Sequence, residues 1–439
     1  MNFNCLTFLI FFLPIFFILF YLIPKKCRYI ILLLGSVLFY SFSSINNLII
    51  VITLALVNYI GTILINKSKK VNILSYILVG LNIIALLFFK YNNNIIFPLG
   101  ISFYTFNNIS YIIDIKRKKI PVEKNILYYL TYILTFTHIT MGPITRYKDI
   151  KENITNLNPN FNEITIGFRR LLFGLIKKVL IADNLGILYS TLINNNNSII
   201  SHIICLLVFA LQLYIDFSSY CDMAIGLGKM IGINYKENFD HPYLVKSISE
   251  FWRKWHITLG EFFKEYVYFP LGGNRVSKFR NIINLLIVWI ITGLWHGNTL
   301  NFLIWGLYYG IILIIEKYVL KKVLDKIPSF LSHLYVIIIV LFGYIFFSIN
   351  NINDILLFIK GMFTSNLIDN TIIFYLKENL LLILIGIILC FKIPNKLKKY
   401  YENSFILQMV INIIYIILYI VAIAYIINGS YTPFMYNAF

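Results

Sequence analysis

Long apolar runs separated by short polar loops make up most of this chain. A helix that crosses a bilayer needs about 20 mainly apolar residues, because its backbone N–H and C=O groups must pair with one another inside the hydrocarbon. By this criterion we expect an all-α, polytopic integral membrane protein with about ten to twelve transmembrane helices. Several runs are short, so we expect some to be tilted or re-entrant. The runs are 6–23, 29–42, 48–65, 73–89, 126–141, 168–189, 199–215, 282–294, 300–315, 334–347, 380–391 and 406–427.

Basic residues between these runs predict the orientation of the first helices. Lys25, Lys26 and Arg28 directly follow the first run, so the positive-inside rule places them in the cytoplasm and Met1 outside. The basic cluster at 67–70 agrees with this alternation, and the cluster at 116–119 agrees if 98–115 crosses at least part of the bilayer. Beyond Arg146 the alternation does not hold simply, so the C-terminal side stays open. No Lys or Arg precedes the first run and no small-residue cleavage site follows it, so we expect a retained helix rather than a signal peptide.

Composition supports a membrane protein and argues against several soluble classes. Only 13% of the 439 residues are charged and 59% are hydrophobic, whereas soluble domains are about 25% charged. The net charge of +19 lies in short loops beside apolar runs, so we expect a bilayer as partner and no nucleic acid. The five cysteines are scattered without CxxC spacing, and no histidine pair has metal-ligand spacing, so we expect no metal. No linker divides the chain, which predicts one membrane domain over 1–439.

Polar, charged and aromatic residues gather between short apolar runs at 212–310. Ionisable groups at membrane depth are costly, and they commonly mark a functional site. The segment FWRKWHIT at 251–258 is one candidate; a helix there would place Trp252, Trp255 and His256 on one face. The alternative is an interfacial belt in which the tryptophans, Arg253 and Lys254 hold a helix at head-group level.

The second candidate is GLWHG at 293–297, where His296 follows Trp295 between two apolar runs. We expect His296 to lie deep in the membrane or at a break between helices, with glycines that let the backbone approach a substrate. The alternative is a histidine that only bonds a neighbouring helix. Two tryptophan-flanked histidines favour function, because histidine can take a proton from a hydroxyl near neutral pH.

Asp216 and the segment PLGGNR at 270–275 are weaker candidates. Asp216 interrupts an apolar tract, so its carboxylate needs a partner. One alternative is a Lys, an Arg or a tyrosine hydroxyl, and the pair would then stabilise the fold. The other is a catalytic histidine, which Asp216 would orient. PLGGNR, which includes Asn274 and Arg275, predicts a turn that binds a phosphate or carboxylate, or merely ends a helix. The chain contains no GxSxG, HxxxD or Walker motif.

These motifs together resemble the bacterial membrane-bound O-acyltransferase (MBOAT) family, of the alginate O-acetyltransferase type. The resemblance covers about 95–310, which we take as the catalytic core. Its residues are 98–106 (PLGISFYTF), Tyr111, Asp114, 142–147 (GPITRY), Gly167, Arg170, Gly174, Lys177, Lys178, 216–220, 222–228, 237–239, 249–256, 268–275, 293–297 and 305–307.

The resemblance implies a ring or funnel of membrane helices in which a cytosolic acyl donor meets an acceptor from the outer face. It also implies that His296 is catalytic and that His256 is the second functional histidine. Such enzymes acetylate alginate, peptidoglycan, cellulose or other exported glycans in the bacterial cytoplasmic membrane, usually with an extracytoplasmic partner protein. A related branch transfers D-alanine toward teichoic acid, which is the first alternative.

We therefore expect acetyl-CoA or another acetyl thioester as donor substrate and no bound cofactor. His296 is the expected base, Trp255, Trp295 and Asp216 are expected to support the site, and Asn274 belongs to the candidate anion-binding turn. Arg253, Lys254 and Arg275 either attract the donor's phosphates or hold the protein at the interface. A polysaccharide transporter and a membrane scaffold are the alternatives of a different class, although no internal duplication typical of transporters is visible.

Overall fold

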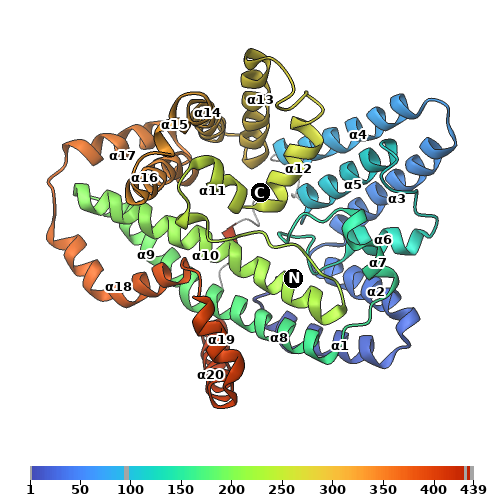
Figure 1. The fold of residues 1–439 in the computed structure, drawn as a ribbon. Coiled ribbons are helices and arrows are strands. Elements are labelled where there is room, and N and C mark those ends of the chain that lie inside the picture. The colour runs from blue at the N-terminus through green and yellow to red at the C-terminus, as the bar shows by residue number, and fades with distance from the viewer. Residues whose placement is uncertain (1, 93–97, 430–432, 436–439) are drawn as a thin grey trace. The chain divides into compact units, whose positions relative to one another are not determined.

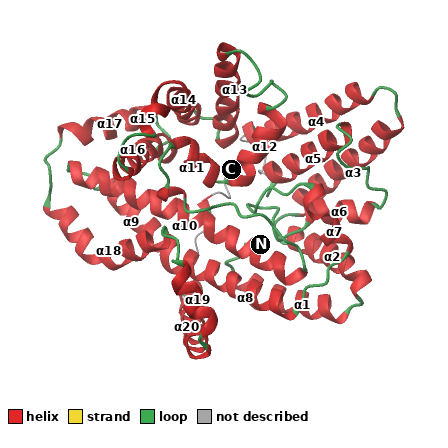
Figure 2. Cartoon of the chain, in the orientation of Figure 1, coloured by secondary structure: helices red, strands yellow, loops and turns green. Residues whose placement is uncertain are grey.

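The computed structural model describes residues 2–92, 98–429 and 433–435, which form helices joined by loops and turns (Figure 2). Within those ranges no strand forms; two isolated bridges pair Ser198 with Asn366 and Phe239 with Trp255. The chain divides into two compact units. The first comprises the described parts of Met1–Gly174 and Tyr220–Glu237, and the second comprises Leu175–Ser219 and the described parts of Asn238–Met435. Helices α8 (Phe161–Ile176) and α10 (Ile199–Ile231) contribute residues to both.

In the first unit, α3, α4 and α5 pack side by side (Figure 1). Asn58 and Asn82 join α3 to α4 through reciprocal amide hydrogen bonds of 3.1 and 2.7 Å. Each amide thereby pairs a polar group that hydrocarbon could not solvate. The elements of this unit are η1 (Thr7–Phe12), α1 (Leu13–Leu22), η2 (Lys25–Cys27), α2 (Arg28–Ser41), α3 (Ile45–Lys67), α4 (Val71–Tyr91), α5 (Ile101–Lys116), α6 (Ile126–Leu134) and α7 (Tyr147–Thr155).

The second unit contains both candidate histidine segments. Helices α18 and α20 leave most of their apolar side chains at least partly exposed, Leu381 and Ile406 among them, as expected for surfaces in contact with lipid. Its elements are η3 (Lys177–Ala182), α9 (Asp183–Asn194), η4 (Pro242–Leu244), α11 (Ile248–Lys254), α12 (Ile257–Phe263), η5 (Lys264–Tyr268), α13 (Lys278–His296), α14 (Leu300–Ile315), η6 (Glu316–Leu320), α15 (Lys321–Leu324), α16 (Ser329–Ser348), α17 (Ile352–Thr364), α18 (Asn370–Leu389), α19 (Asn395–Asn403) and α20 (Phe405–Ile427).

Eight helices in the described ranges are long and apolar enough to cross a bilayer, and the shorter apolar stretch Thr7–Leu22 adds to them. The all-α, multi-pass architecture is therefore confirmed. The difference from the larger expected number arises where apolar runs do not form full-length helices. The run 126–141 forms a helix only as far as Leu134, after which a polar stretch that includes Thr135 and His138 forms turns.

Candidate functional site

The α13–α14 hairpin positions His296. The two helices cross at Gly293 and Gly306, where an added Cβ on Gly293 would overlap the carbonyl oxygen of Phe302 and one on Gly306 would overlap that of Trp289. Small residues at such crossings let helix backbones approach closely in a membrane. The crossing holds His296, the last residue of α13, against the beginning of α14.

His296 is buried among aromatic rings that come from three helices. Its ring centroid lies 4.7 Å from that of Trp295, 4.8 Å from Trp305, 5.2 Å from Phe347 and 6.2 Å from Phe302. The helix ends directly afterwards at Gly297, where an added Cβ would overlap the Phe302 ring. The prediction of a histidine at a break between helices is thus confirmed.

The backbone at His256 differs from the predicted helix face. Helix α11 ends at Lys254, Trp255 is extended, and His256 has φ 46° before α12 begins at Ile257. The prediction that Trp252, Trp255 and His256 share one helical face is therefore wrong. Trp255 instead forms the bridge to Phe239 and packs edge-on against its ring at 5.2 Å. This break turns the buried His256 ring toward a partner outside the helix.

That partner is Asn238, whose side-chain oxygen lies 3.2 Å from Nδ1 of His256. The same oxygen accepts the backbone N–H of Thr258 at 3.2 Å. A backbone N–H can only donate, so this atom of Asn238 is the acceptor, and Nδ1 of His256 carries the proton. Burial lowers the pKa of His256 to about 3. The ring is therefore neutral at pH 7, with Nε2 as the basic nitrogen.

Both histidines contact the ring of Trp295, whose centroid lies 6.3 Å from that of His256 and 4.7 Å from that of His296. The structure thus brings together the two segments that the sequence singled out. Phe217 adds an edge-to-face contact to His256 at 4.8 Å. The resulting site is a pair of buried imidazoles enclosed by aromatic rings, which can move a proton where bulk water is scarce.

Two site residues lacked a distinguishing signal in the sequence. Asn238 orients His256, yet the chain is rich in asparagine. Glu316 accepts the backbone N–H groups of Ile248 and Ser249 at 2.6 and 2.8 Å. A carboxylate at a helix N-terminus satisfies donors that have no partner within the helix. Glu316 therefore fixes the start of α11, but its separation in sequence from that helix hides this role.

Asp216 pairs with a cation rather than with either histidine. Its Oδ1 lies 2.7 Å from Nζ of Lys178, which also lies 2.7 Å from Oδ1 of Asp183. The backbone N–H of Met435 donates to Oδ2 of Asp216 at 2.9 Å. Buried charges need such pairing. This geometry matches the fold-stabilising alternative for Asp216.

The basic candidates lie on more exposed parts of the second unit. Lys254 forms ion pairs with Asp240 at 3.7 Å and Glu250 at 3.4 Å, and Arg253 donates to the carbonyl of Ser249 at 3.2 Å. The exposed side chains of Arg253 and Arg275 carry charge that a dissolved anion can reach.

PLGGNR forms the predicted turn, with φ of 100° at Gly272 and 56° at Gly273. Nζ of Lys317 donates to the side-chain oxygen of Asn274 at 2.6 Å. The turn therefore places Asn274 beside a cation of η6.

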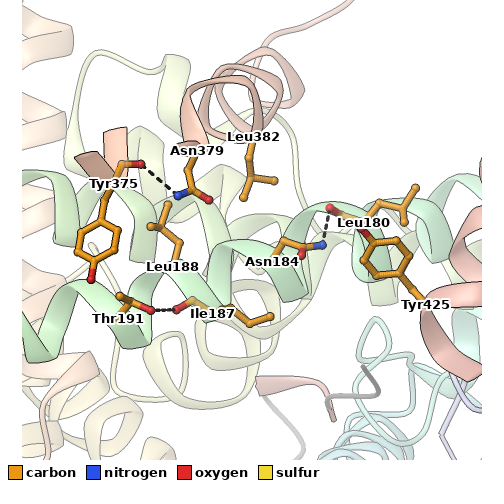
Figure 3. A pocket seen from close by; sticks show the side chains of 9 residues that line it. All are labelled: Leu180, Asn184, Ile187, Leu188, Thr191, Tyr375, Asn379, Leu382 and Tyr425. Carbon is orange, nitrogen blue, oxygen red and sulfur yellow. Dashed lines mark hydrogen bonds between the residues drawn. The ribbon is translucent and has the colours of Figure 1, made fainter. Parts of the chain in front are cut away.

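A cavity of about 340 Å³ lies elsewhere in this unit, between α9, α18 and α20 (Figure 3). The amides of Asn184 and Asn379 there donate to carbonyls of their own helices, as the dashed lines show. Neither histidine lines it, so it is separate from the candidate site. Its lining is Leu180, Asn184, Ile187, Leu188, Thr191, Tyr375, Asn379, Leu382 and Tyr425.

Comparison with known proteins settles the family of the chain. The model of the membrane-bound O-acyltransferase family matches residues 37–359, a range that includes both histidines. The chain belongs to this family. It is therefore a multi-pass membrane O-acyltransferase, as the resemblance predicted.

The relatives that resemble this chain are named for different substrates. A probable alginate O-acetylase of Pseudomonas aeruginosa is 33% identical over 83% of this chain and 75% of its own length. A peptidoglycan O-acetyltransferase of Helicobacter pylori is 31% identical over 82% of the chain and 79% of its own length. A teichoic acid D-alanyltransferase of Bacillus subtilis is 27% identical over 50% of the chain and 59% of its own length.

Proposed function

We propose that this O-acyltransferase transfers an acetyl group from a cytosolic thioester toward hydroxyls of an exported cell-envelope polysaccharide. The observation that carries the proposal is the pair of buried histidines, each at a break between two helices and both in contact with Trp295. The relatives that align over most of the chain are named for acetyl transfer to alginate and peptidoglycan. These names support an acetyl group and a glycan acceptor.

His296 acts as the base in the proposed reaction. It takes the proton of the acceptor hydroxyl while the hydroxyl oxygen forms a bond to the thioester carbon. The tetrahedral intermediate then collapses, the C–S bond breaks, and the departing thiolate accepts from His296 the proton that came from the acceptor hydroxyl. His256 serves as the second functional histidine, with Nε2 as its acceptor atom because Asn238 holds the proton on Nδ1.

Acetyl-CoA is the proposed donor, used as a substrate without a resident cofactor. The exposed cations Arg253 and Arg275, together with Lys254, attract its phosphates from the cytoplasmic side. An extracytoplasmic partner protein completes transfer to the exported glycan. We keep 95–310 as the proposed catalytic core of a single membrane domain with its helices in a ring or funnel; residues 95–97 lie outside the described ranges.

D-alanyl transfer to teichoic acid is the second candidate. The D-alanyltransferase of Bacillus subtilis aligns with half of the chain. The PLGGNR turn favours the glycan-acetylating branch by resemblance, so acetyl transfer ranks first. Supplying labelled D-alanine and labelled acetyl groups to cells that carry the chain separates the two donors by the label that reaches the envelope.

The deciding experiment compares O-acetyl content of envelope glycans in cells that carry the wild-type chain, His296→Ala, or no chain. We expect His296→Ala to match the deletion, because loss of a general base costs about 10²–10⁴-fold in rate. His333→Ala is the matched control, since His333 lies on α16 and its Nδ1 forms a hydrogen bond with the backbone carbonyl of Val245 rather than belonging to the candidate site. Full acetylation by His296→Ala at equal membrane abundance would favour a transporter or scaffold.

A further inference from the structure

Three buried hydrogen-bond donors near His296 lack acceptors. Within the described ranges, the indole Nε1 atoms of Trp252 and Trp305 and the hydroxyl of Tyr309 have no hydrogen-bond partner. Such groups are rare in folded proteins, because burial removes water without replacing its hydrogen bonds. Three such donors that pack against one another can share an acceptor that arrives with a ligand.

The donors occupy neighbouring positions. Trp305 and Tyr309 lie one helical turn apart on α14, with ring centroids 5.3 Å apart. Trp252 from α11 packs edge-on against both, at 5.5 Å from Trp305 and 4.8 Å from Tyr309. Glu316 holds the start of α11, so the position of Trp252 is fixed by a hydrogen-bonded helix end.

Trp305 is the member of the cluster in contact with His296, with ring centroids 4.8 Å apart and planes at 77°. Tyr309 lies further from the histidine along α14, and its hydroxyl rests on Gly343, where an added Cβ would overlap it. The glycine at that position makes room for the hydroxyl itself. The donors therefore begin with Trp305 beside His296 and continue along α14 to Tyr309, with Trp252 of α11 packed against both.

An indole N–H can also point at the face of a neighbouring ring. The edge-to-face packing of Trp252 and Trp305 permits this contact. It is weaker than a bond to oxygen, and it does not supply an acceptor for Tyr309. A ligand-binding role and a ring-contact role for the Trp305 N–H predict different effects on transfer when this N–H is removed without changing the shape of the ring.

We propose that Trp305 donates its indole N–H to the carbonyl oxygen of the acyl group during transfer, and that Trp252 and Tyr309 bind a second oxygen of the same thioester donor. The inference rests on the proposed function. As the acceptor oxygen bonds to the thioester carbon, the C=O electron pair moves onto the carbonyl oxygen, and the hydrogen bond from Trp305 strengthens. When the C–S bond breaks, that pair re-forms the carbonyl and the thiol leaves with the proton from His296.

The test uses the full chain in membrane vesicles from cells that also make the proposed extracytoplasmic partner protein, with acetyl-CoA as donor and alginate or peptidoglycan oligosaccharides as acceptors. The decisive variant replaces Trp305 with its benzothiophene analogue, which exchanges the N–H for sulfur and keeps the ring shape. We expect kcat to fall about 10²–10³-fold, as for other oxyanion donors, with KM for acetyl-CoA changed by less than about threefold. Trp305→Phe should show the same direction.

Tyr309→Phe provides the second arm, because it removes only the hydroxyl. We expect it to raise KM for acetyl-CoA with little change in kcat, since the second oxygen is bound equally in the ground state and the transition state. Trp289→Phe is the matched control: Trp289 packs against Trp305, with 6.0 Å between ring centroids, but it is not one of the three donors. It should retain wild-type kcat and KM.

The outcomes separate this inference from the proposed function. If wild type is active and His296→Ala is inactive, but the sulfur analogue at 305 keeps wild-type kcat, the assignment of Trp305 is wrong while the function stands. An equal loss of kcat in Trp289→Phe and in the Trp305 variants would also overturn the assignment of Trp305, and it would indicate that both tryptophans act only through packing. No thioester consumption by wild type with either acceptor would count against the function itself.

Discussion

His256 adopts a backbone conformation that residues with a Cβ rarely take. Its φ of 46° lies in the left-handed region, which costs about 1–2 kcal/mol for an L-residue. The conformation is held by the Phe239–Trp255 bridge before it and by α12 after it. Strain of this kind persists where surrounding contacts fix it, and it commonly occurs at functional sites. Here it directs Nδ1 of His256 to Asn238.

Asn238→Ala tests the role of that contact. The variant removes the acceptor of His256 Nδ1 and of the Thr258 N–H, so the imidazole loses its fixed tautomer and orientation. We expect acetyl transfer to fall about 10–100-fold, the range typical of residues that orient functional histidines. Glycan O-acetyl content and thioester consumption measure the effect. Asn379→Ala in α18 is the control; an equal loss there would indicate a general folding defect.

The buried neutral state of His256 also predicts acid sensitivity. Its pKa is lowered to about 3 from the usual 6.5. Between these values the unfolded chain binds a proton that the native chain does not, so stability falls as pH decreases, by at most about 1.4 kcal/mol per pH unit.

Thermal unfolding in detergent at pH 7, 6, 5 and 4 measures this dependence. We expect His256→Gln to lose stability less steeply below about pH 6.5 than wild type, because it has no imidazole to protonate. Above pH 7 the two chains should show the same dependence on pH. Identical slopes below pH 6.5 would contradict a buried neutral His256.

At the scale of elements, the α13–α14 crossing predicts that one added methyl group disturbs the site. In Gly306→Ala the new Cβ would overlap the carbonyl of Trp289, which is backbone and cannot rotate away. We expect a loss of stability of about 1–3 kcal/mol from overpacking, together with reduced transfer as α14 shifts from His296. Unfolding midpoints in detergent measure the first effect.

Gly80→Ala is the matched control for this prediction. Gly80 also lies inside a candidate spanning helix, α4, but an added Cβ there meets no atom within 4 Å. Alanine favours helix more than glycine by about 1 kcal/mol, so this variant should be neutral or slightly stabilised. Similar destabilisation in both variants would show that the crossing is not closely packed.

The sequence predicts helices better than it predicts their ends. Hydropathy identifies α3, α4, α10 and α20 because each pairs its backbone internally along an apolar run. It fails at the break after Lys254, because FWRKWHIT has helical spacing and contains neither proline nor glycine. The bridge from Trp255 to Phe239 overrides that local preference. Tertiary contacts of this kind are not visible in spacing.

At the scale of the whole chain, the basic loops predict how the first helices are oriented in the membrane, and the order of the described helices is compatible with this topology. With Met1 outside, we predict that the loop at Ser43 between α2 and α3 is extracytoplasmic and that the loop at Lys69 between α3 and α4 is cytoplasmic. With native cysteines replaced by alanine, Ser43→Cys should react with an impermeant maleimide in intact cells.

The matched variant Lys69→Cys should react only after the cells are permeabilised. Both positions are exposed in the structure, so accessibility of the side chain itself does not differ between them. Labelling of position 69 from outside would reverse the predicted orientation.

The site was predictable as far as its histidines, and less so in its supporting contacts. His256 and His296 stood out because ionisable residues are costly among apolar runs. Asp216 was equally visible, yet it pairs with Lys178, which also pairs with Asp183, and spacing alone left this partner open. Asn238 and Glu316 act on segments that lie elsewhere in sequence, so only the folded chain shows what they contact.

The aromatic contacts around the histidines have a practical consequence. All five tryptophans of the chain, at 252, 255, 289, 295 and 305, belong to this region. Trp295 contacts both imidazoles, Trp305 links His296 to Trp252 and Trp289, and Phe251 contacts both Trp252 and Trp255. Tryptophan fluorescence, excited at a wavelength that tyrosine does not absorb, therefore reports on this region of the unlabelled enzyme. Titration of donor or acceptor can be followed as a change in emission intensity or wavelength.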